Sequence, residues 1–217
     1  TICLVGSEMC IRDSYRTTAY QFNNTEHAAN LFGLKEFGNI YSRLGNPTVG
    51  ALEARLTALE EGAMCVALSS GTSAVMYSLI NIMSQGDNFV TANQLYGGTY
   101  TMFDNILPEY GINSKKVDIT DLEAVEAAID EKTRAIYCET ITNPGLVVAD
   151  ISALADIAHS KGIPLIVDAT FTTSAILKPF EYGADIVVYS LTKWMSGHGR
   201  VIAGAVIEKG GFDWGQW

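Results

Sequence analysis

Residues 185–193 read Asp-Ile-Val-Val-Tyr-Ser-Leu-Thr-Lys, and this stretch carries the pattern that decides the fold. Its apolar run, Ile186 to Tyr189, is short, rich in β-branched side chains and followed by polar residues. Runs of this kind are typical of strands that are buried on both faces of a parallel sheet. The polar residues after the run then lie at the carboxyl end of the strand.

Six further runs of the same kind occur along the chain. The predicted strands are Met64–Ser69, Asn88–Ala92, Ser114–Val117, Ala135–Glu139, Leu165–Asp168, Ile186–Ser190 and Gly204–Ile207. Helices are predicted between most of them, at Ser73–Met83, Gly98–Glu109, Asp121–Ile129 and Ile151–Ser160. This alternation predicts an α/β fold, with a mostly parallel seven-stranded sheet and helices on both faces.

The chain before the first strand divides into parts of different character. Residues 1–14 show neither helical nor strand periodicity and no secretory signal pattern, so we expect a non-native leader. Residues 15–46 are polar, aromatic and irregular, which is typical of an extended arm. Leucines at helical spacing follow Pro47, so the compact α/β domain is predicted over 47–217.

The composition excludes several classes of protein. Of the 217 residues, 48% are hydrophobic and 18% are charged, which supports a buried core and excludes a mainly disordered chain. The 14 basic residues are scattered among 24 acidic ones, giving a net charge of −10, so we expect no nucleic-acid partner. Residues 62–86 carry no charge, but the small and polar residues of Ser69–Ser73 interrupt them, so we expect no membrane span.

The cysteines and histidines indicate the compartment and exclude a metal site. Cys65 and Cys138 lie inside predicted strands, and the four cysteines of the chain form no CxxC pair. Free thiols in a core are typical of the reducing cytoplasm. The three histidines are far apart in sequence, so no metal is predicted.

Two groups of residues at strand ends are suited to a flat, anionic ligand, because parallel sheets bind ligands at the carboxyl ends of their strands. Ser69-Ser70-Gly71-Thr72-Ser73 leads into a helix, and amides at a helix N-terminus form an anion site. Tyr96 stands beside Gly97 and Gly98 after the next strand, where its ring could stack on a ligand. Plain helix capping and a core tyrosine are the respective alternatives.

Three further strand ends carry polar side chains. Asn143-Pro144-Gly145 follows the fourth strand and is equally typical of a plain turn. Asp168 ends an apolar strand, where its carboxylate needs a partner such as a protonated heterocyclic nitrogen, a helix N-terminus or an arginine. Lys193 follows the sixth strand, where a desolvated amine becomes a nucleophile, although its head could equally reach solvent.

Together these positions supply the groups that pyridoxal phosphate requires, namely a phosphate anchor, a ring cover, a partner for the ring nitrogen and an amine. Two rival patterns explain less. Ser190-Leu191-Thr192-Lys193 also fits the SxxK pattern of penicillin-recognising serine enzymes, but the companion SDN and KTG motifs are absent from the sequence. Gly197-His198-Gly199 lacks the Rossmann spacing for dinucleotide binding.

From about Tyr15 to its end, the chain resembles the Cys/Met-metabolism family of pyridoxal-phosphate enzymes. The motifs that carry the resemblance are Asn24-Thr25-Glu26-His27-Ala28-Ala29, Phe37-Gly38-Asn39-Ile40-Tyr41-Ser42-Arg43, Asn46-Pro47-Thr48, Leu95-Tyr96-Gly97-Gly98-Thr99, Ser190-Leu191-Thr192-Lys193 and Gly197-His198-Gly199. The resemblance implies the large domain of a fold-type-I pyridoxal-phosphate transferase. Where the family usually has Asp-Asn-Thr, this chain has Asp168-Ala169-Thr170.

The resemblance also implies roles for individual residues. Lys193 would bind the cofactor covalently and move protons, with Tyr96 as the second catalytic residue and ring cover. Asp168 would pair with the ring nitrogen, and Asn143 would lie near the 3′-oxygen. The remaining cofactor contacts would be Ser70, Gly71, Thr72, Thr170, Ser190 and Thr192, with Tyr41 and Arg43 donated to a neighbouring subunit. The arm 15–46 would therefore contact that neighbour in a homo-oligomer, a homotetramer for the full-length protein.

The motifs are most similar to those of members that replace the acetate of O-acetylhomoserine with sulfide or methanethiol, giving homocysteine or methionine. Reactions of the methionine γ-lyase or cystathionine γ-synthase type are the alternatives. Family members are longer and have a smaller C-terminal domain that grips the substrate carboxylate, so we expect a C-terminally truncated chain. An inactive cofactor-binding fragment is therefore a further alternative.

Overall fold

The computed structural model describes residues 2–3, 10–11 and 14–216, and it divides the chain into two compact units, Thr1–Arg55 and Leu56–Trp217. Most of the predicted leader, 1–14, lies outside the described residues. Within it, the two-residue strands β1 (Ile2–Cys3) and β2 (Cys10–Ile11) pair antiparallel.

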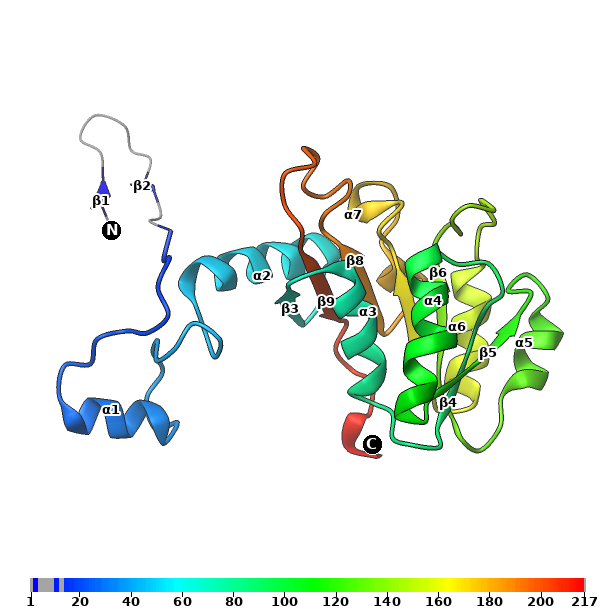
Figure 1. The fold of residues 1–217 in the computed structure, drawn as a ribbon, viewed down its shortest axis with the longest axis horizontal. Helices are drawn as coiled ribbons and strands as arrows, with labels where there is room; N and C mark the ends of the chain where they lie inside the picture. Colours follow the sequence, from blue (N-terminus) through cyan, green and yellow to red (C-terminus); the bar gives the residue numbers. More distant parts are fainter. Residues whose placement is uncertain (1, 4–9, 12–13, 217) are drawn as a thin grey trace. The chain divides into compact units, whose positions relative to one another are not determined.

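A seven-stranded sheet forms the centre of the unit Leu56–Trp217 (Figure 1). In spatial order its strands are β3 (Met64–Leu68), β9 (Gly204–Glu208), β8 (Ile186–Ser190), β7 (Leu165–Asp168), β6 (Thr133–Glu139), β4 (Asn88–Ala92) and β5 (Asn113–Val117). The pairs from β8 to β5 are all parallel, whereas β9 is antiparallel to both of its neighbours. Only β9 therefore runs against the rest, and the predicted mostly parallel sheet is confirmed.

Helices cover both faces of this sheet. Every residue of β4 is buried, and because successive side chains of a strand point to opposite faces, both faces must be covered. The helices of this unit are α3 (Gly71–Ile80), α4 (Gly97–Thr101), α5 (Leu122–Ala128), α6 (Ile151–Ser160) and α7 (Thr173–Ile176). Among them, α3 packs against β8 and β9, and α6 against β6 and β7.

The helix predicted at Gly98–Glu109 is not a uniform α-helix. After α4 it continues as a π-helix over Met102–Ile106 and a 3-10 helix over Leu107–Tyr110. Pro108 supplies a physical reason, because proline has no amide to donate to the α-helical ladder. Two further 3-10 turns, Pro179–Tyr182 and Trp214–Gln216, complete the described part of the unit.

The unit Thr1–Arg55 contains a helix where the sequence predicts an irregular arm. This helix, α1 (Thr25–Phe32), begins after Asn24, whose Oδ1 accepts a hydrogen bond of 2.8 Å from the amide of His27. Capping by an asparagine side chain explains its start. The predicted helix after Asn46 is present as α2 (Pro47–Glu60).

Two observations bear on the expected compartment and on membranes. The thiols of Cys65 and Cys138 are buried, as predicted for core cysteines. In the described part of the chain, no helix is both long enough and apolar enough to span a bilayer.

Candidate active site

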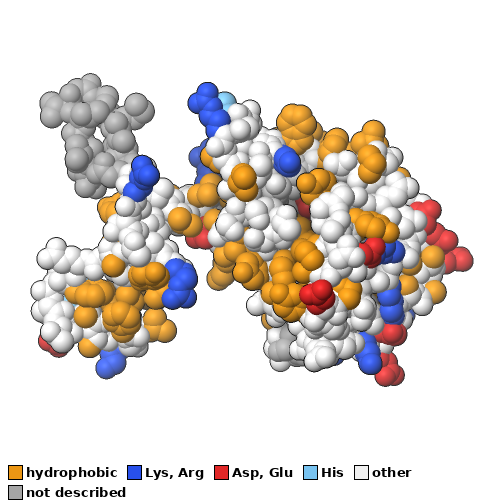
Figure 2. Space-filling model, in the orientation of Figure 1, with side chains coloured by type: hydrophobic (Ala, Val, Ile, Leu, Met, Phe, Trp, Pro, Cys, Tyr) orange, Lys and Arg blue, Asp and Glu red, His pale blue; other side chains and the backbone are white. Residues whose placement is uncertain are grey.

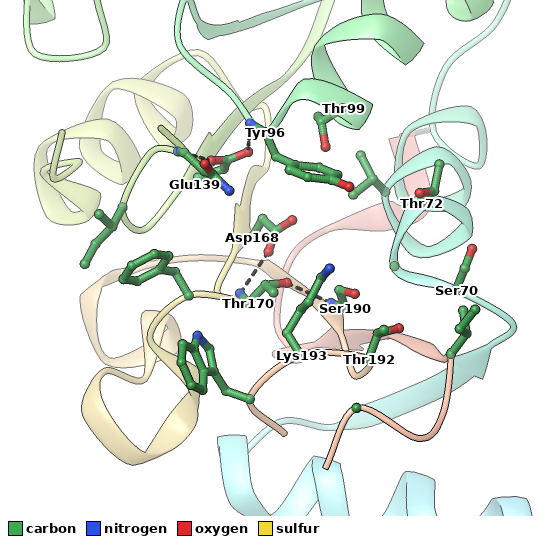
Figure 3. Close-up of a pocket in the computed structure, with 18 of the residues that line it drawn as sticks. Ser70, Thr72, Tyr96, Thr99, Glu139, Asp168, Thr170, Ser190, Thr192 and Lys193 are labelled. Atoms are coloured by element: carbon green, nitrogen blue, oxygen red, sulfur yellow. Dashed lines mark hydrogen bonds between the residues drawn. The ribbon is translucent and has the colours of Figure 1, made fainter. Parts of the chain in front are cut away.

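A cavity of about 660 Å³ lies at the carboxyl ends of β6, β7 and β8 and the first turns of α3 and α4 (Figure 3). The cofactor residues predicted for the unit Leu56–Trp217 all line it: Ser70, Gly71, Thr72, Tyr96, Asn143, Asp168, Thr170, Ser190, Thr192 and Lys193. The common direction of the strands explains this convergence, because it brings their carboxyl ends to one edge of the sheet.

The first turn of α3 forms a cradle suited to an anion. Ser70 caps the helix by accepting a hydrogen bond of 3.0 Å from the amide of Ser73. The helix itself offers no acceptor for its first amides, those of Gly71 and Thr72. A Cβ atom at Gly71 would lie 2.5 Å from Cβ of Ser190, so only glycine lets the helix approach the end of β8 this closely. Amides and hydroxyl groups thus gather where a phosphate would bind.

Replacing Gly71 with alanine should destabilise the domain by about 1–3 kcal/mol, because the new methyl group overlaps Ser190. Gly97→Ala is the matched control, since a Cβ atom there has no neighbour within 4 Å. Urea unfolding measures both variants. Equal midpoints for Gly71→Ala and the unaltered chain would show that the close contact is not required.

Tyr96 and Lys193 face one another across the cavity. Nζ of Lys193 lies 6.0 Å from the centroid of the Tyr96 ring, and both side chains are exposed within the opening. A Cβ atom at Gly98 would lie 2.7 Å from Cε1 of Tyr96, so that glycine leaves room for the ring. Tyr96 is 47% exposed, so its ring is not part of the core.

The groups that donate hydrogen bonds to the carboxylate of Asp168 are uncharged. The amide of Thr170 donates to its Oδ1 at 2.9 Å, and the hydroxyl of the buried Tyr137 donates to its Oδ2 at 3.3 Å. Burial nevertheless raises the pKa of Asp168 above its ordinary value. The hydroxyl of Thr170 accepts from the amide of Ser190 at 2.7 Å and so ties the ends of β7 and β8 together. A cation entering the cavity would therefore find an under-compensated carboxylate.

Glu139 is a cavity residue that the sequence reasoning did not select. It ends β6, is only 5% exposed, and is paired in register with Asp168 on β7. Its Oε1 accepts from the amide of Tyr96 at 2.7 Å, and its Oε2 accepts from the amide of Asn143 at 3.0 Å. Burial, with a further contribution from the charge of Asp168, raises the pKa of Glu139 to about 7. The signal that singled out Asp168, a carboxylate at the end of an apolar strand, also applies here.

The raised pKa of Glu139 predicts that the stability of the domain falls as the pH rises from 4.5 to 7. Below pH 4.5 the carboxyl is protonated in both states, and above pH 7 it is ionised in both. Between these limits only the unfolded chain loses the proton, so ionisation favours unfolding. The pKa difference from 4.5 to about 7 corresponds to a loss of at most about 3 kcal/mol in the free energy of unfolding.

Denaturant unfolding at several pH values checks this, with Glu139→Gln as the reference because glutamine does not titrate. The stability difference between the two proteins should change across this pH range. A difference that is independent of pH would contradict the raised pKa.

Other residues complete the wall of the cavity. Phe171, Trp194 and Ile202 are exposed apolar side chains at 43%, 68% and 75%. The hydroxyl of Thr192, a predicted phosphate contact, already exchanges hydrogen bonds with the backbone of Ala203 at 3.1 and 3.2 Å. The opening is therefore partly apolar, as expected for a small-molecule site.

Tyr41 and Arg43 belong to the other unit, Thr1–Arg55, and their predicted role at a neighbour's phosphate stays a prediction. Cζ of Arg43 lies 5.6 Å from the centroid of the Tyr41 ring. Among the described residues, no group of three His, Cys, Asp or Glu side chains is placed to hold a metal ion.

The donor set of the cavity fits pyridoxal phosphate. The cradle of α3, which a Cβ atom at Gly71 would fill, suits the phosphate, and Tyr96 provides an aromatic face. The under-compensated carboxylate of Asp168 suits a protonated ring nitrogen, and Lys193 provides the amine.

Comparison with known proteins places this site in context. Residues 8–217 match the family model described as Cys/Met metabolism PLP-dependent enzyme. O-acetyl-L-homoserine sulfhydrylase from Leptospira meyeri is 48% identical over 202 residues, which are 93% of this chain and 46% of that protein. This chain spans about half the length of the curated relatives that it matches.

Two solved structures are similar over most of the chain. A putative O-acetylhomoserine (thiol)-lyase from Campylobacter jejuni, solved with N′-pyridoxyl-lysine-5′-monophosphate, is 43% identical with a TM-score of 0.89. The similarity covers 93% of this chain and 50% of that one. Cystathionine gamma-lyase from Lactobacillus plantarum, complexed with L-serine, is 37% identical with a TM-score of 0.83, over 91% of this chain and 49% of that one.

Proposed function

Because the chain belongs to the Cys/Met metabolism family of pyridoxal-phosphate-dependent enzymes, we propose that it is the cofactor-binding part of an enzyme that replaces the acetate of O-acetylhomoserine with sulfide or methanethiol. The products are homocysteine or methionine, and acetate. One observation carries the proposal, namely the convergence of Lys193, Asp168 and Tyr96 with the α3 cradle in one cavity. The names of the relatives described above support the choice of substrate.

Named residues would hold the cofactor. The amides of Gly71 and Thr72 and the hydroxyls of Ser70, Ser190 and Thr192 would bind the phosphate, Thr170 would line the site, and Asn143 would lie near the 3′-oxygen. Asp168 would keep the ring nitrogen protonated, Tyr96 would cover the ring, and Lys193 would form the covalent link. When bound, pyridoxal phosphate supplies an electron sink for a carbanion at the α-carbon of the substrate.

The chain's own groups would move the protons. The freed Nζ of Lys193 takes the α-proton of the substrate, and proton removal at the β-carbon then allows acetate to leave from the γ-carbon. Tyr96 is the second group that carries protons, because its ring lies 6.0 Å from the amine of Lys193. The sulfur of sulfide or methanethiol then bonds to the γ-carbon, and the protons return to the β- and α-carbons.

A γ-elimination is the second candidate function, favoured by the similarity to cystathionine gamma-lyase. In that reaction the γ-group leaves without replacement, and water releases an α-keto acid and ammonia.

The test uses the purified chain with pyridoxal phosphate, O-acetylhomoserine and sulfide. Homocysteine and acetate as products would support the proposal, whereas a keto acid and ammonia would support the elimination. A covalently bound cofactor without turnover would identify an inactive cofactor-binding fragment. A chain that binds no cofactor would overturn the whole assignment.

We further propose that the unit Thr1–Arg55 contacts a second copy of the chain, with Tyr41 and Arg43 reaching the neighbour's phosphate. Its support is the apolar surface of this unit, which Figure 2 shows in orange. Among its apolar side chains, Phe32, Leu34 and Phe37 are 64%, 88% and 105% exposed. Exposed apolar groups in such number are typical of an interface. A homotetramer is the expected state of the full-length protein, and the buried thiols of Cys65 and Cys138 support a cytoplasmic location.

Mixing two inactive variants tests the shared site. In a hybrid of Lys193→Ala with Arg43→Ala chains, one of the two sites has both residues. Random pairing should then restore about a quarter of the wild-type number of sites that bind the cofactor tightly, since half of the dimers are hybrids. No recovery on mixing, with exchange of chains verified, would show that Arg43 does not act across an interface.

A further inference from the structure

The carboxylate of Glu139 lies between two loops that carry predicted cofactor contacts. One loop leads from β4 into α4 and carries Tyr96, and the other follows β6 and carries Asn143. Each oxygen of Glu139 accepts one backbone amide, that of Tyr96 at 2.7 Å and that of Asn143 at 3.0 Å (Figure 3 shows the first). A single buried side chain therefore joins both loops.

A second observation shows that these loops are in close contact. A Cβ atom at Gly145 would lie 1.6 Å from Oε1 of Gln94, which precedes Tyr96 by two residues. The side chain of Gln94 therefore packs against the backbone at Gly145 and brings the two loops into contact. Neither amide belongs to a strand ladder, and Glu139 provides the acceptor for each of them.

We propose that Glu139 is a positioning residue, whose two carboxylate oxygens clamp the Tyr96 and Asn143 loops together and so hold the ring cover and the amide contact in register around the cofactor. The role of Glu139 at the cofactor rests on the proposed function. The two hydrogen bonds of the clamp are present in the chain without the cofactor. A carboxylate is suited to this task because it is acceptor-only, whereas an amide side chain presents one acceptor and one donor.

Charged and titratable groups from the neighbouring elements face this clamp. Asp168 stands beside Glu139 on β7, the buried Tyr137 of β6 donates to Asp168, and Lys193 approaches from beyond β8. Repulsion from Asp168 opposes the ionised form of Glu139. A cation paired with Asp168 would relieve this repulsion. It would thereby favour the ionised form of Glu139, which accepts hydrogen bonds from both amides.

Nuclear magnetic resonance of the cofactor-free chain tests the clamp directly. The amide protons of Tyr96 and Asn143 should shift together with pH, with one common midpoint near 7, because both report the ionisation of one carboxylate. Glu139→Gln should abolish this shared titration. Asp185→Asn is the matched control, since Asp185 is also a buried carboxylate that accepts a backbone amide, that of Leu165 at 2.8 Å, before β8.

The titration in the unaltered chain decides the matter even if a variant fails to fold. Separate midpoints for the two amides would overturn the clamp, because one carboxylate gives one midpoint. A shared titration that persists in Glu139→Gln would do the same.

Cofactor affinity tests the purpose of the clamp. Glu139→Gln should weaken the binding of pyridoxal phosphate about tenfold, as expected for one lost hydrogen bond to a charged group, while Asp185→Asn should not. The effect should shrink in a Tyr96→Ala background, because part of it acts through the ring. Equal affinity of wild type and Glu139→Gln would refute the positioning role. If the wild type itself binds no cofactor, the proposed function fails, while the amide titration still decides the clamp.

Discussion

Replacing Lys193 with alanine should abolish the covalent attachment of pyridoxal phosphate and lower turnover by about 10³-fold, the range of a lost catalytic base. Among the described residues that line the cavity, Lys193 alone carries an amine. No other described lining residue can therefore form the covalent bond to the cofactor. The Nζ atom of Lys193 lies 6.0 Å from the centroid of the Tyr96 ring. We therefore expect Lys193→Ala to lose covalent attachment of the cofactor completely, whether or not the unaltered chain catalyses the reaction.

Borohydride reduction followed by mass spectrometry measures the attachment without any need for turnover. The wild type should gain one pyridoxyl group, located by peptide mapping on Lys193. Lys193→Arg should stay unlabelled although it keeps the charge, and Lys161→Ala should be labelled normally. Lys161 is a suitable control because it pairs with Glu126 at 2.8 Å and is not a lining residue. Equal labelling of Lys193→Ala would place the link elsewhere.

The core of the fold was predictable because the strand runs are short, apolar and bounded by polar residues. The run that ends at Ser190 is apolar on both faces of the strand, so both faces must be buried. This holds for a parallel sheet whatever the order of its strands. The strand order and the antiparallel direction of β9 were not predictable, since β9 is an apolar run like the strands that run parallel to one another. Pairing depends on contacts between residues far apart in sequence.

The candidate site was predictable to the extent that its residues follow strands. Asp168 and Lys193 were found by this rule, and Glu139 obeys it equally but was passed over in favour of Asn143. What the sequence does not contain is which backbone groups a carboxylate meets, because the amides of Tyr96 and Asn143 reach Glu139 only after the loops fold. The helix α1 was missed for a local reason, since its start depends on one capping contact of Asn24.

Replacing Asp168 with asparagine should leave the cofactor covalently bound but lower turnover by about 10²- to 10³-fold. Asparagine keeps the shape of the side chain and can still accept from the amide of Thr170. It cannot, however, keep a ring nitrogen protonated, and an unprotonated ring is a poor electron sink. Turnover should therefore fall while attachment through Lys193, measured by borohydride reduction, persists.

The same substitution should have opposite effects on the stability of the cofactor-free and the cofactor-bound protein. Burial raises the pKa of Asp168, so its ionisation costs folding free energy, and this loss of stability develops as the pH rises through the folded-state pKa. At pH 8 the cofactor-free Asp168→Asn protein should thus be at least as stable as the wild type. A cation bound beside Asp168 offsets that cost only in the wild type, so the thermal stabilisation by pyridoxal phosphate should be smaller in the variant. Asp185→Asn, whose carboxylate lies outside the cavity, should keep the full stabilisation. Equal stabilisation of Asp168→Asn and the wild type would mean that Asp168 does not pair with the cofactor, and that its buried charge is held for the structure alone.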